Sequence, residues 1–335
     1  MGGSAGIHHV TAICSDAKRN VAFYTGVLGL RMVKQTVNFD DPTAWHLYYG
    51  DETGRPGTAL TFFARGQTPT GRNGNGMAVE TAFIIPEAAL GYWTQRLVER
   101  GIDHDAPEKR FGETVLPLRD PDGMRLALVA TKNASEIPGW SNGEVPGEHA
   151  VRGFHGVTLM AEAPAPTAEV LTGAFGIKAA AREGIRHRFH RQADRLGQAV
   201  DILAAAGFLA GCQGAGSVHH VALRKPIWSA CSTPRDCVRP ISSTVATSAR
   251  FISASRAACC SKLPPTTRAS PSTSRRRPSA LRSSCRPGTR HDAPRSPPPC
   301  RRSRESIGLP ARRQNSSVAC TWEHSFVLCP ARLTQ

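Results

Sequence analysis

Two pairs of adjacent histidines, His8-His9 and His219-His220, are the residues of this chain best suited to chemistry. Each pair lies in a short stretch rich in Val and Ala, which is typical of a β-strand. Because successive side chains of a strand point to opposite faces, we expect one histidine of each pair to enter the site. Neutral imidazole binds divalent metals and can also move protons. The pairs predict a metal or acid–base site; the alternative is that they are strand residues satisfied by neighbouring backbone groups.

The strand that carries the histidines recurs along the chain. Its variants are GIHHVTAI at 6–13, GFHGVTL at 153–159 and SVHHVAL at 217–223. Apolar patterning and turn residues predict a helix and further strands after the first copies: helices at 17–28, 86–100 and 167–175, and strands at 31–39, 45–49, 59–63, 79–85, 113–117, 124–129, 186–189 and 199–203. A unit of roughly 65 residues, strand, helix and three strands, therefore repeats. The fourth copy starts at Ser217 and is cut off.

The composition changes near Lys225. Residues 225–335 contain 20 Lys and Arg against 4 Asp and Glu, so the whole net charge of +16 lies there, and residues 1–224 are balanced. The segment Pro264–Arg312 has too few apolar residues to fold and is predicted to be disordered. It also lacks the interleaved aromatic residues of a single-strand-binding arm, so we expect no specific nucleic-acid partner.

No apolar run approaches the length of a membrane span, and residues 1–10 lack the pattern of a signal peptide. Only Cys14 and Cys212 lie in the first 224 residues, too few for a disulfide framework. We expect a cytoplasmic protein without membrane partners.

Several longer segments resemble a known family: GIHHVTAICSD, FYTGVLGLRMVKQTVNFDDP, WHLYYGDETGRPGT, RFGE, DPDGMRLALV, EHAVRGFHGVT and VHHVAL. They are similar to the ring-cleaving dioxygenases of the vicinal oxygen chelate superfamily, in particular the hydroquinone-type branch and its glyoxalase-like relatives. The resemblance covers residues 6 to about 224.

The resemblance implies an α+β fold of tandem βαβββ modules that form cupped mixed sheets, with the fourth module incomplete. It divides the chain into an N-terminal domain (1–148) and a truncated C-terminal domain (149–224). The Arg/Ser/Pro-rich tail (225–335) that follows is expected to be out of frame and disordered. It implies cleavage of an aromatic diol, a hydroquinone or catechol, by dioxygen at Fe(II), with Mn(II) as the second choice of metal. A homo-oligomer is compatible with this family.

The family's first two metal ligands match His9 and His220. His8, Thr11 and His219 are then candidates for contacting the substrate or supporting the ligands. His155, in the equivalent strand of the third module, has no second histidine beside it and is expected to be structural.

The third ligand of the family, a Glu late in the fourth module, is not present in the written sequence. Shifting the reading frame of Thr247–Lys262 back by one base can encode YFRSIYFREPGGVLFE, which is similar to the family's segment with that Glu. We hypothesise a frameshift near Lys225, which leaves the chain impaired as translated. Asp236 and Glu305 are conceivable substitutes, but neither lies in a strand pattern.

Other readings remain open. A glyoxalase-like isomerase or thiol-transfer protein could use Glu80 as a ligand, and a metal-free binding protein of the same fold would be non-catalytic. His46 and Tyr48 alternate with Leu47 and Tyr49, so either face of that strand could be core. We expect the basic cluster 186–191 to be a solvated strand edge and the segment 71–76 to be a flexible turn.

Overall fold

The computed structural model describes residues 6–39, 41–141, 143–190 and 196–224, and the backbone of two short strands at 250–253 and 325–329. These residues all belong to one compact unit, which comprises Met1–Cys259 and Trp322–Gln335. Several sequence-based expectations fall on residues outside the described ones: the disorder of Pro264–Arg312, the substitutes Asp236 and Glu305, and the segment 247–262 apart from its strand 250–253.

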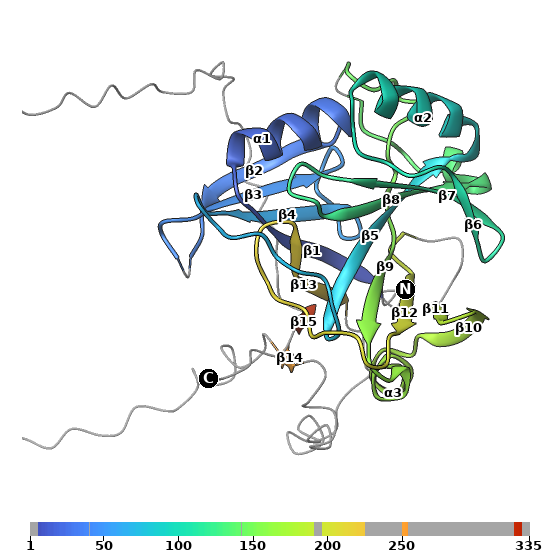
Figure 1. Ribbon diagram of the computed structural model, residues 1–335. Helices are drawn as coiled ribbons and strands as arrows, with labels where there is room; N and C mark the ends of the chain where they lie inside the picture. The colour runs from blue at the N-terminus through green and yellow to red at the C-terminus, as the bar shows by residue number, and fades with distance from the viewer. Residues whose placement is uncertain are drawn as a thin grey trace, which may run out of the picture. The chain divides into compact units, whose positions relative to one another are not determined.

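The fold is α+β and rests on two curled mixed sheets, as predicted (Figure 1). The first sheet has the order β14-β15-β13-β1-β4-β3-β2. Its strands are β1 (Ile7–Cys14), β2 (Arg31–Val37), β3 (Trp45–Gly50), β4 (Ala59–Ala64), β13 (Ser217–Arg224), β14 (Arg250–Ser253) and β15 (Ser325–Cys329). The second has the order β10-β11-β12-β9-β5-β8-β7-β6. Its strands are β5 (Met77–Pro86), β6 (Glu108–Arg110), β7 (Glu113–Arg119), β8 (Arg125–Thr131), β9 (Gly153–Ala161), β10 (Lys178–Glu183), β11 (Arg186–His190) and β12 (Ala199–Ala204).

The repeat is visible in the pairing of the strands. In each of the first three modules the first strand lies parallel to the last one: β1 beside β4, β5 beside β8, and β9 beside β12. Between modules, β1 pairs antiparallel with β13 and β5 with β9. Each sheet thus combines strands from both sides of the predicted division at residues 148 and 149. That division remains a prediction.

The predicted helices are present. Asp16 caps α1 (Ala17–Val21) by accepting a hydrogen bond from the Arg19 N–H at 2.7 Å, and the helix continues as a wider π-helical segment, Ala22–Val27. A short 3₁₀ turn (Glu87–Ala89) precedes α2 (Leu90–Glu99). Pro164 opens α3 (Pro164–Phe175). Among the described residues no helix is long and apolar enough to span a bilayer.

The sequence did not predict β14 and β15, and their pairing contradicts the expected disorder of the tail 225–335 at 250–253 and 325–329. It did not predict β6 and β10 either. β6 is only three residues long, and all six residues of β10 are exposed, so neither carries an apolar pattern. They exist because a neighbouring strand offers hydrogen-bonding groups at the edge of the sheet.

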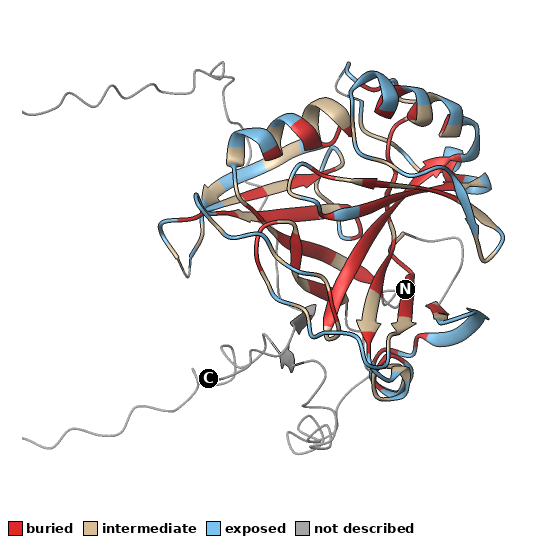
Figure 2. Ribbon diagram, viewed as in Figure 1, coloured by how far each residue is buried: buried red, intermediate tan, exposed pale blue. Residues whose placement is uncertain are grey.

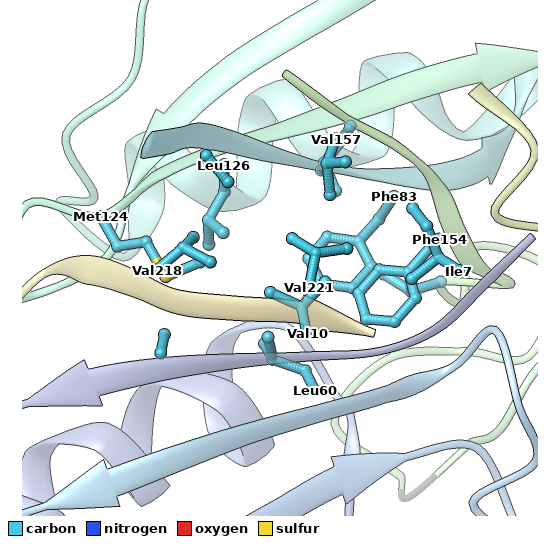
Figure 3. Packing of buried hydrophobic residues seen from close by; sticks show 14 of the residues in the cluster. Ile7, Val10, Leu60, Phe83, Met124, Leu126, Phe154, Val157, Val218 and Val221 are labelled. Carbon is cyan, nitrogen blue, oxygen red and sulfur yellow. The ribbon is translucent and has the colours of Figure 1, made fainter. Parts of the chain in front are cut away.

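The core fills the space between the two sheets. Figure 3 shows side chains of both sheets interdigitating; the first contributes Ile7, Val10, Val218 and Val221, and the second contributes Phe83, Phe154 and Val157. All ten residues of β5 are buried, as its colour along the whole strand shows (Figure 2). A strand covered on both faces must be apolar almost throughout, which explains why β5 has no alternating pattern.

Two glycine-rich loops pair with each other where β5 and β13 begin. The backbones of Arg72 and Cys212 exchange two hydrogen bonds of 2.8 Å. A Cβ on Gly74 would lie 2.4 Å from the Leu209 carbonyl oxygen, so only glycine fits there. The expectation of a flexible turn at 71–76 is therefore wrong, because a second loop of the same kind, 209–216, satisfies its backbone.

Candidate metal centre

A β-bulge at each histidine pair determines where the rings point. The pairing of β1 with β13 skips one residue in each strand, His8 and His219. An extra residue of this kind breaks the alternation of side chains. The core residues that flank each pair are consequently three positions apart: Ile7 and Val10 in β1, Val218 and Val221 in β13. Strand alternation therefore does not select one histidine of each pair, and which of the two enters the site stays a prediction.

The four rings form a continuous chain. Nδ1 of His8 lies 3.0 Å from Nδ1 of His9, and Nδ1 of His219 lies 2.8 Å from Nδ1 of His220. The two pairs meet where Nε2 of His9 and Nε2 of His220 are 3.1 Å apart. The fold thus brings together the four histidines that the sequence selected.

Burial favours the neutral form of His8, His9 and His220. It lowers the pKa of His220 to about 3, with the neighbouring His219 and His46 contributing further. Burial is also the main reason that the pKa of His9 lies well below its ordinary value, and the pKa of His8 is lowered by burial and by the charge of Arg224. Neutral imidazole is the form that binds a metal ion.

The separation of the two Nε2 atoms fits a metal. Two ligand nitrogens about 2.1 Å from one ion and at right angles to each other lie about 3.0 Å apart, close to the observed 3.1 Å. In that state His9 and His220 would both carry their protons on Nδ1. His8 and His219 can accept hydrogen bonds from these two N–H groups. Among the described residues no group of three or more His, Cys, Asp or Glu side chains converges, so they contain no third ligand here.

Thr11 lies beside this centre. It pairs directly with His220 across the β1–β13 ladder, and its Oγ1 lies 2.8 Å from the Oγ1 of Thr61. His46 Nε2 lies 3.1 Å from the same Thr61 oxygen, and the Tyr48 hydroxyl lies 2.9 Å from His46 Nδ1. Leu47 and Tyr49 are buried in the core, so the open question about this strand is settled.

His46 is also neutral. Burial, followed by the charge of Lys34 and of His219, lowers the pKa of His46 to about 4. The ring of Phe63 lies between two histidines, with centroids 4.6 Å from His46 and 5.3 Å from His219. Phe63 therefore forms an apolar wall beside the centre.

Glu80 lies in the other sheet, on β5. Its carboxylate binds Arg110 Nη1 at 2.6 Å and accepts a hydrogen bond from Thr158 at 3.3 Å. By register Glu80 faces Thr158 as His220 faces Thr11. The second sheet thus has an ion pair where the first has a histidine, and the structure does not bring Glu80 to His9 and His220.

The basic cluster on β11 also belongs to this second site. Arg188 donates to Asp201 at 2.8 and 3.0 Å and pairs with Glu113, and Arg186 donates to Asp201 at 3.2 Å. Burial alone would raise the pKa of Glu113, but His155 and Arg188 outweigh it and lower that pKa to about 2. A solvated strand edge is therefore the wrong interpretation: β11 lies inside the sheet and Arg188 is only 9% exposed.

Comparisons with known proteins identify relatives of this chain. Residues 6–128 match the family model of the Glyoxalase/Bleomycin resistance protein/Dioxygenase superfamily. MhqO of Bacillus subtilis, named as a ring-cleaving dioxygenase, is 42% identical over 220 residues, which are 65% of this chain and 69% of MhqO. The chlorohydroquinone/hydroquinone 1,2-dioxygenase of Sphingobium indicum is 29% identical over 222 residues, 65% of this chain and 69% of that enzyme.

Solved structures show the same relationship. A structure from Bacillus subtilis, named as a dioxygenase, matches with a TM-score of 0.61 and 40% identity over 64% of this chain and 68% of that one. Glyoxalase I from Zea mays shares the fold, with a TM-score of 0.50 at 14% identity over 65% of this chain and 73% of that one. Cupped sheets of repeated βαβββ modules define the class. The chain belongs to the Glyoxalase/Bleomycin resistance protein/Dioxygenase superfamily, among the ring-cleaving dioxygenases.

Sequence reasoning missed His46, Tyr48 and Thr61 as neighbours of Thr11. The segment 45–49 alternates apolar and polar residues, but both faces carry aromatic rings. These residues come together through the register of β1, β4 and β3, and the sequence carries no signal of that register.

Proposed function

We propose that this chain is built as a metal-dependent ring-cleaving dioxygenase for a hydroquinone or catechol-like diol, with Fe(II) held by His9 and His220. The observation that carries the proposal is the approach of their Nε2 atoms to 3.1 Å, in strands separated by 211 positions. The relatives named as ring-cleaving dioxygenases support the reaction type. The choice of Fe(II) ahead of Mn(II) rests on the family resemblance of the sequence. Bound there, the metal would supply Lewis acidity toward a diol oxygen and one-electron chemistry toward dioxygen.

The protein's own residues have distinct roles in this proposal. His8 and His219 accept hydrogen bonds from the Nδ1–H groups of the two ligands and so fix the orientation of their rings. Thr11, which faces His220 in register, hydrogen-bonds a hydroxyl group of the diol. Phe63 supplies an apolar surface for the aromatic ring.

The chain as translated is proposed to be impaired. The described residues offer two imidazoles and no carboxylate at the centre. A site with two of three ligands holds a metal more weakly, because affinity follows the number of ligands and their support. The Glu of the family's fourth module belongs to the sequence that the proposed frameshift replaced.

The glyoxalase-like alternative has less support. Glu80 is already paired with Arg110 and Thr158 in the second sheet, where no histidine pair accompanies it. A metal-free binding protein would need neither of the two histidine pairs.

The test compares the chain as written with a version whose reading frame is restored after Lys225. Both are loaded anaerobically with Fe(II), and oxygen uptake is followed with hydroquinone and with catechol. We expect stoichiometric uptake from the restored chain and little from the written one. Turnover of a glutathione hemithioacetal without oxygen uptake would support the isomerase instead, and the absence of metal binding and turnover in both versions would refute the proposal.

A further inference from the structure

Four side chains form an unbroken hydrogen-bonded line across three strands of the first sheet. The line runs from Thr11 on β1 to Thr61 on β4, and then to His46 and Tyr48 on β3. Its three contacts measure 2.8, 3.1 and 2.9 Å, all within hydrogen-bond range.

Backbone register explains why the line exists. Thr11 pairs with Thr61, and Thr61 pairs with Tyr48, in direct register on adjacent strands. His46 precedes Tyr48 by two positions on the same face, so its ring bridges the Thr61 and Tyr48 side chains. At its inner end, Thr11 pairs in register with the candidate ligand His220.

The line leads from the interior toward the surface. Thr61 and Thr11 are 0% and 1% exposed, whereas His46 and Tyr48 are half-buried. Lys34, an exposed residue, holds its ammonium group 5.5 Å from the centre of the Tyr48 ring. A proton that enters at Thr11 would thus leave at a site that water and a cation can reach.

Each member of the line can both donate and accept a hydrogen bond. In one direction Thr11 donates to Thr61, Thr61 donates to His46 Nε2, and His46 Nδ1–H donates to Tyr48. In the other direction every bond is reversed, and the imidazole has exchanged tautomers without acquiring a charge. The two states contain the same number of protons, and each proton of the line has moved by one position.

We propose that Thr11, Thr61, His46 and Tyr48 form a proton relay that carries away the hydroxyl proton of the bound diol. The diol proton passes to Thr11 Oγ1, the Thr11 proton to Thr61, the Thr61 proton to His46 Nε2, the His46 Nδ1 proton to the Tyr48 oxygen, and the Tyr48 proton to solvent. The diol loses one proton, solvent gains one, and no electron moves. This inference rests on the proposed function, because it needs a diol at the centre.

A purely structural role for the line predicts a different outcome from a relay. Tyr48→Phe removes the outer hydroxyl and keeps the ring below Lys34. Tyr49→Phe is the matched control: it is the same change one residue away, on the opposite face, where the Tyr49 hydroxyl donates to Asn20 at 2.8 Å. Thr61→Val interrupts the middle of the line at nearly constant volume.

The first measurement uses the full chain without metal or substrate. The ¹⁵N resonances of His46 report which ring nitrogen carries the proton. We expect Tyr48→Phe and Thr61→Val to change the tautomer population of His46, and Tyr49→Phe to leave it unchanged. An identical His46 spectrum in Tyr48→Phe would show that the line does not govern the ring, and the relay would be rejected.

The second measurement follows proton release with an indicator dye when hydroquinone is mixed anaerobically with the Fe(II)-loaded chain whose reading frame is restored after Lys225, which is the wild type of this comparison. We expect Tyr48→Phe to slow release at least about tenfold and to lose the slowing that wild type shows in D₂O, while Tyr49→Phe behaves as wild type. Binding and release in wild type with no effect in Tyr48→Phe would overturn the relay alone. No diol binding by wild type would overturn the proposed function, and the relay with it.

Discussion

His9 Nε2 and His220 Nε2 lie 3.1 Å apart, within hydrogen-bond range, and a hydrogen bond between them requires a proton on one of the two atoms. A metal ion between them would replace that bond and require both lone pairs. Metal binding is therefore linked to a change of tautomer in at least one of the rings, and His8 and His219 determine how readily it occurs.

The metal affinity should depend on the four histidines in two classes. We expect His9→Ala and His220→Ala to weaken Fe(II) or Mn(II) binding by more than about 100-fold, since each removes a ligand. His8→Ala and His219→Ala should weaken it by about 10 to 100-fold through loss of support. Anaerobic titration calorimetry measures both. His155→Ala is the control, because this residue holds the place on β9 that His8 holds on β1. A drop there as large as in His9→Ala would argue against the assigned site.

The stability of the metal-free protein should fall in acid. The pKa of His220 is about 3 and that of His46 about 4, both below the ordinary value of 6.5. Between the folded and the ordinary pKa values, the unfolded chain therefore binds more protons than the folded chain. The free energy of unfolding is fully retained above pH 6.5 and falls as the pH approaches 4. Urea unfolding at pH 7, 5.5 and 4.5 measures the slope, which His220→Gln should flatten.

Asp120 should oppose this trend. Burial raises the pKa of Asp120 to about 6. The contribution of Asp120 to the free energy of unfolding is therefore present below its ordinary pKa of 3.8 and is lost as the pH rises through 6. Asp120→Asn removes that titration, and the same urea series should then show a steeper rise in stability between pH 4 and 6. An unchanged slope would mean that Asp120 does not titrate in this range.

Glu80 should matter for stability and not for metal. Glu80→Gln removes the charge that Arg110 binds at 2.6 Å, while Arg110 keeps Glu108 at 2.5 Å. We expect a loss of about 1 to 3 kcal/mol in the free energy of unfolding, with unchanged metal affinity. Loss of metal binding in this variant would instead revive the glyoxalase-like reading.

The paired loops should tolerate no side chain at their closest points. Gly74→Ala and Gly214→Ala each place a Cβ 2.4 Å from a carbonyl oxygen, so we expect each to cost about 1 to 3 kcal/mol or more. Gly91→Ala, where a Cβ meets nothing within 4 Å on α2, should stabilise by about 0.5 to 1 kcal/mol. Thermal unfolding of the three variants checks the predicted loss of stability in the loops and the predicted gain on α2.

The sequence predicted the repeating module and the histidine pairs because both depend on local patterns. The strand 6–13 and its copies could be recognised by composition, and the helix at 17–28 by its cap and its apolar positions. The bulges at His8 and His219 could not be predicted, because a bulge is a property of two strands in register. The same is true of Arg188: its charge suggested solvent, and only the fold shows Asp201 and Glu113 beside it.

The paired glycine loops affect what a screen for folded protein can detect. The loop 209–216 is held by the loop 69–76, and β13, the strand of His220, pairs with β1. The residues that make these two sets of contacts all precede Lys225. A gene whose reading frame changed after that codon would still encode both histidines in their places. A solubility or expression assay would accept its product as intact, and only an assay for bound metal or turnover would distinguish it from an unaltered gene.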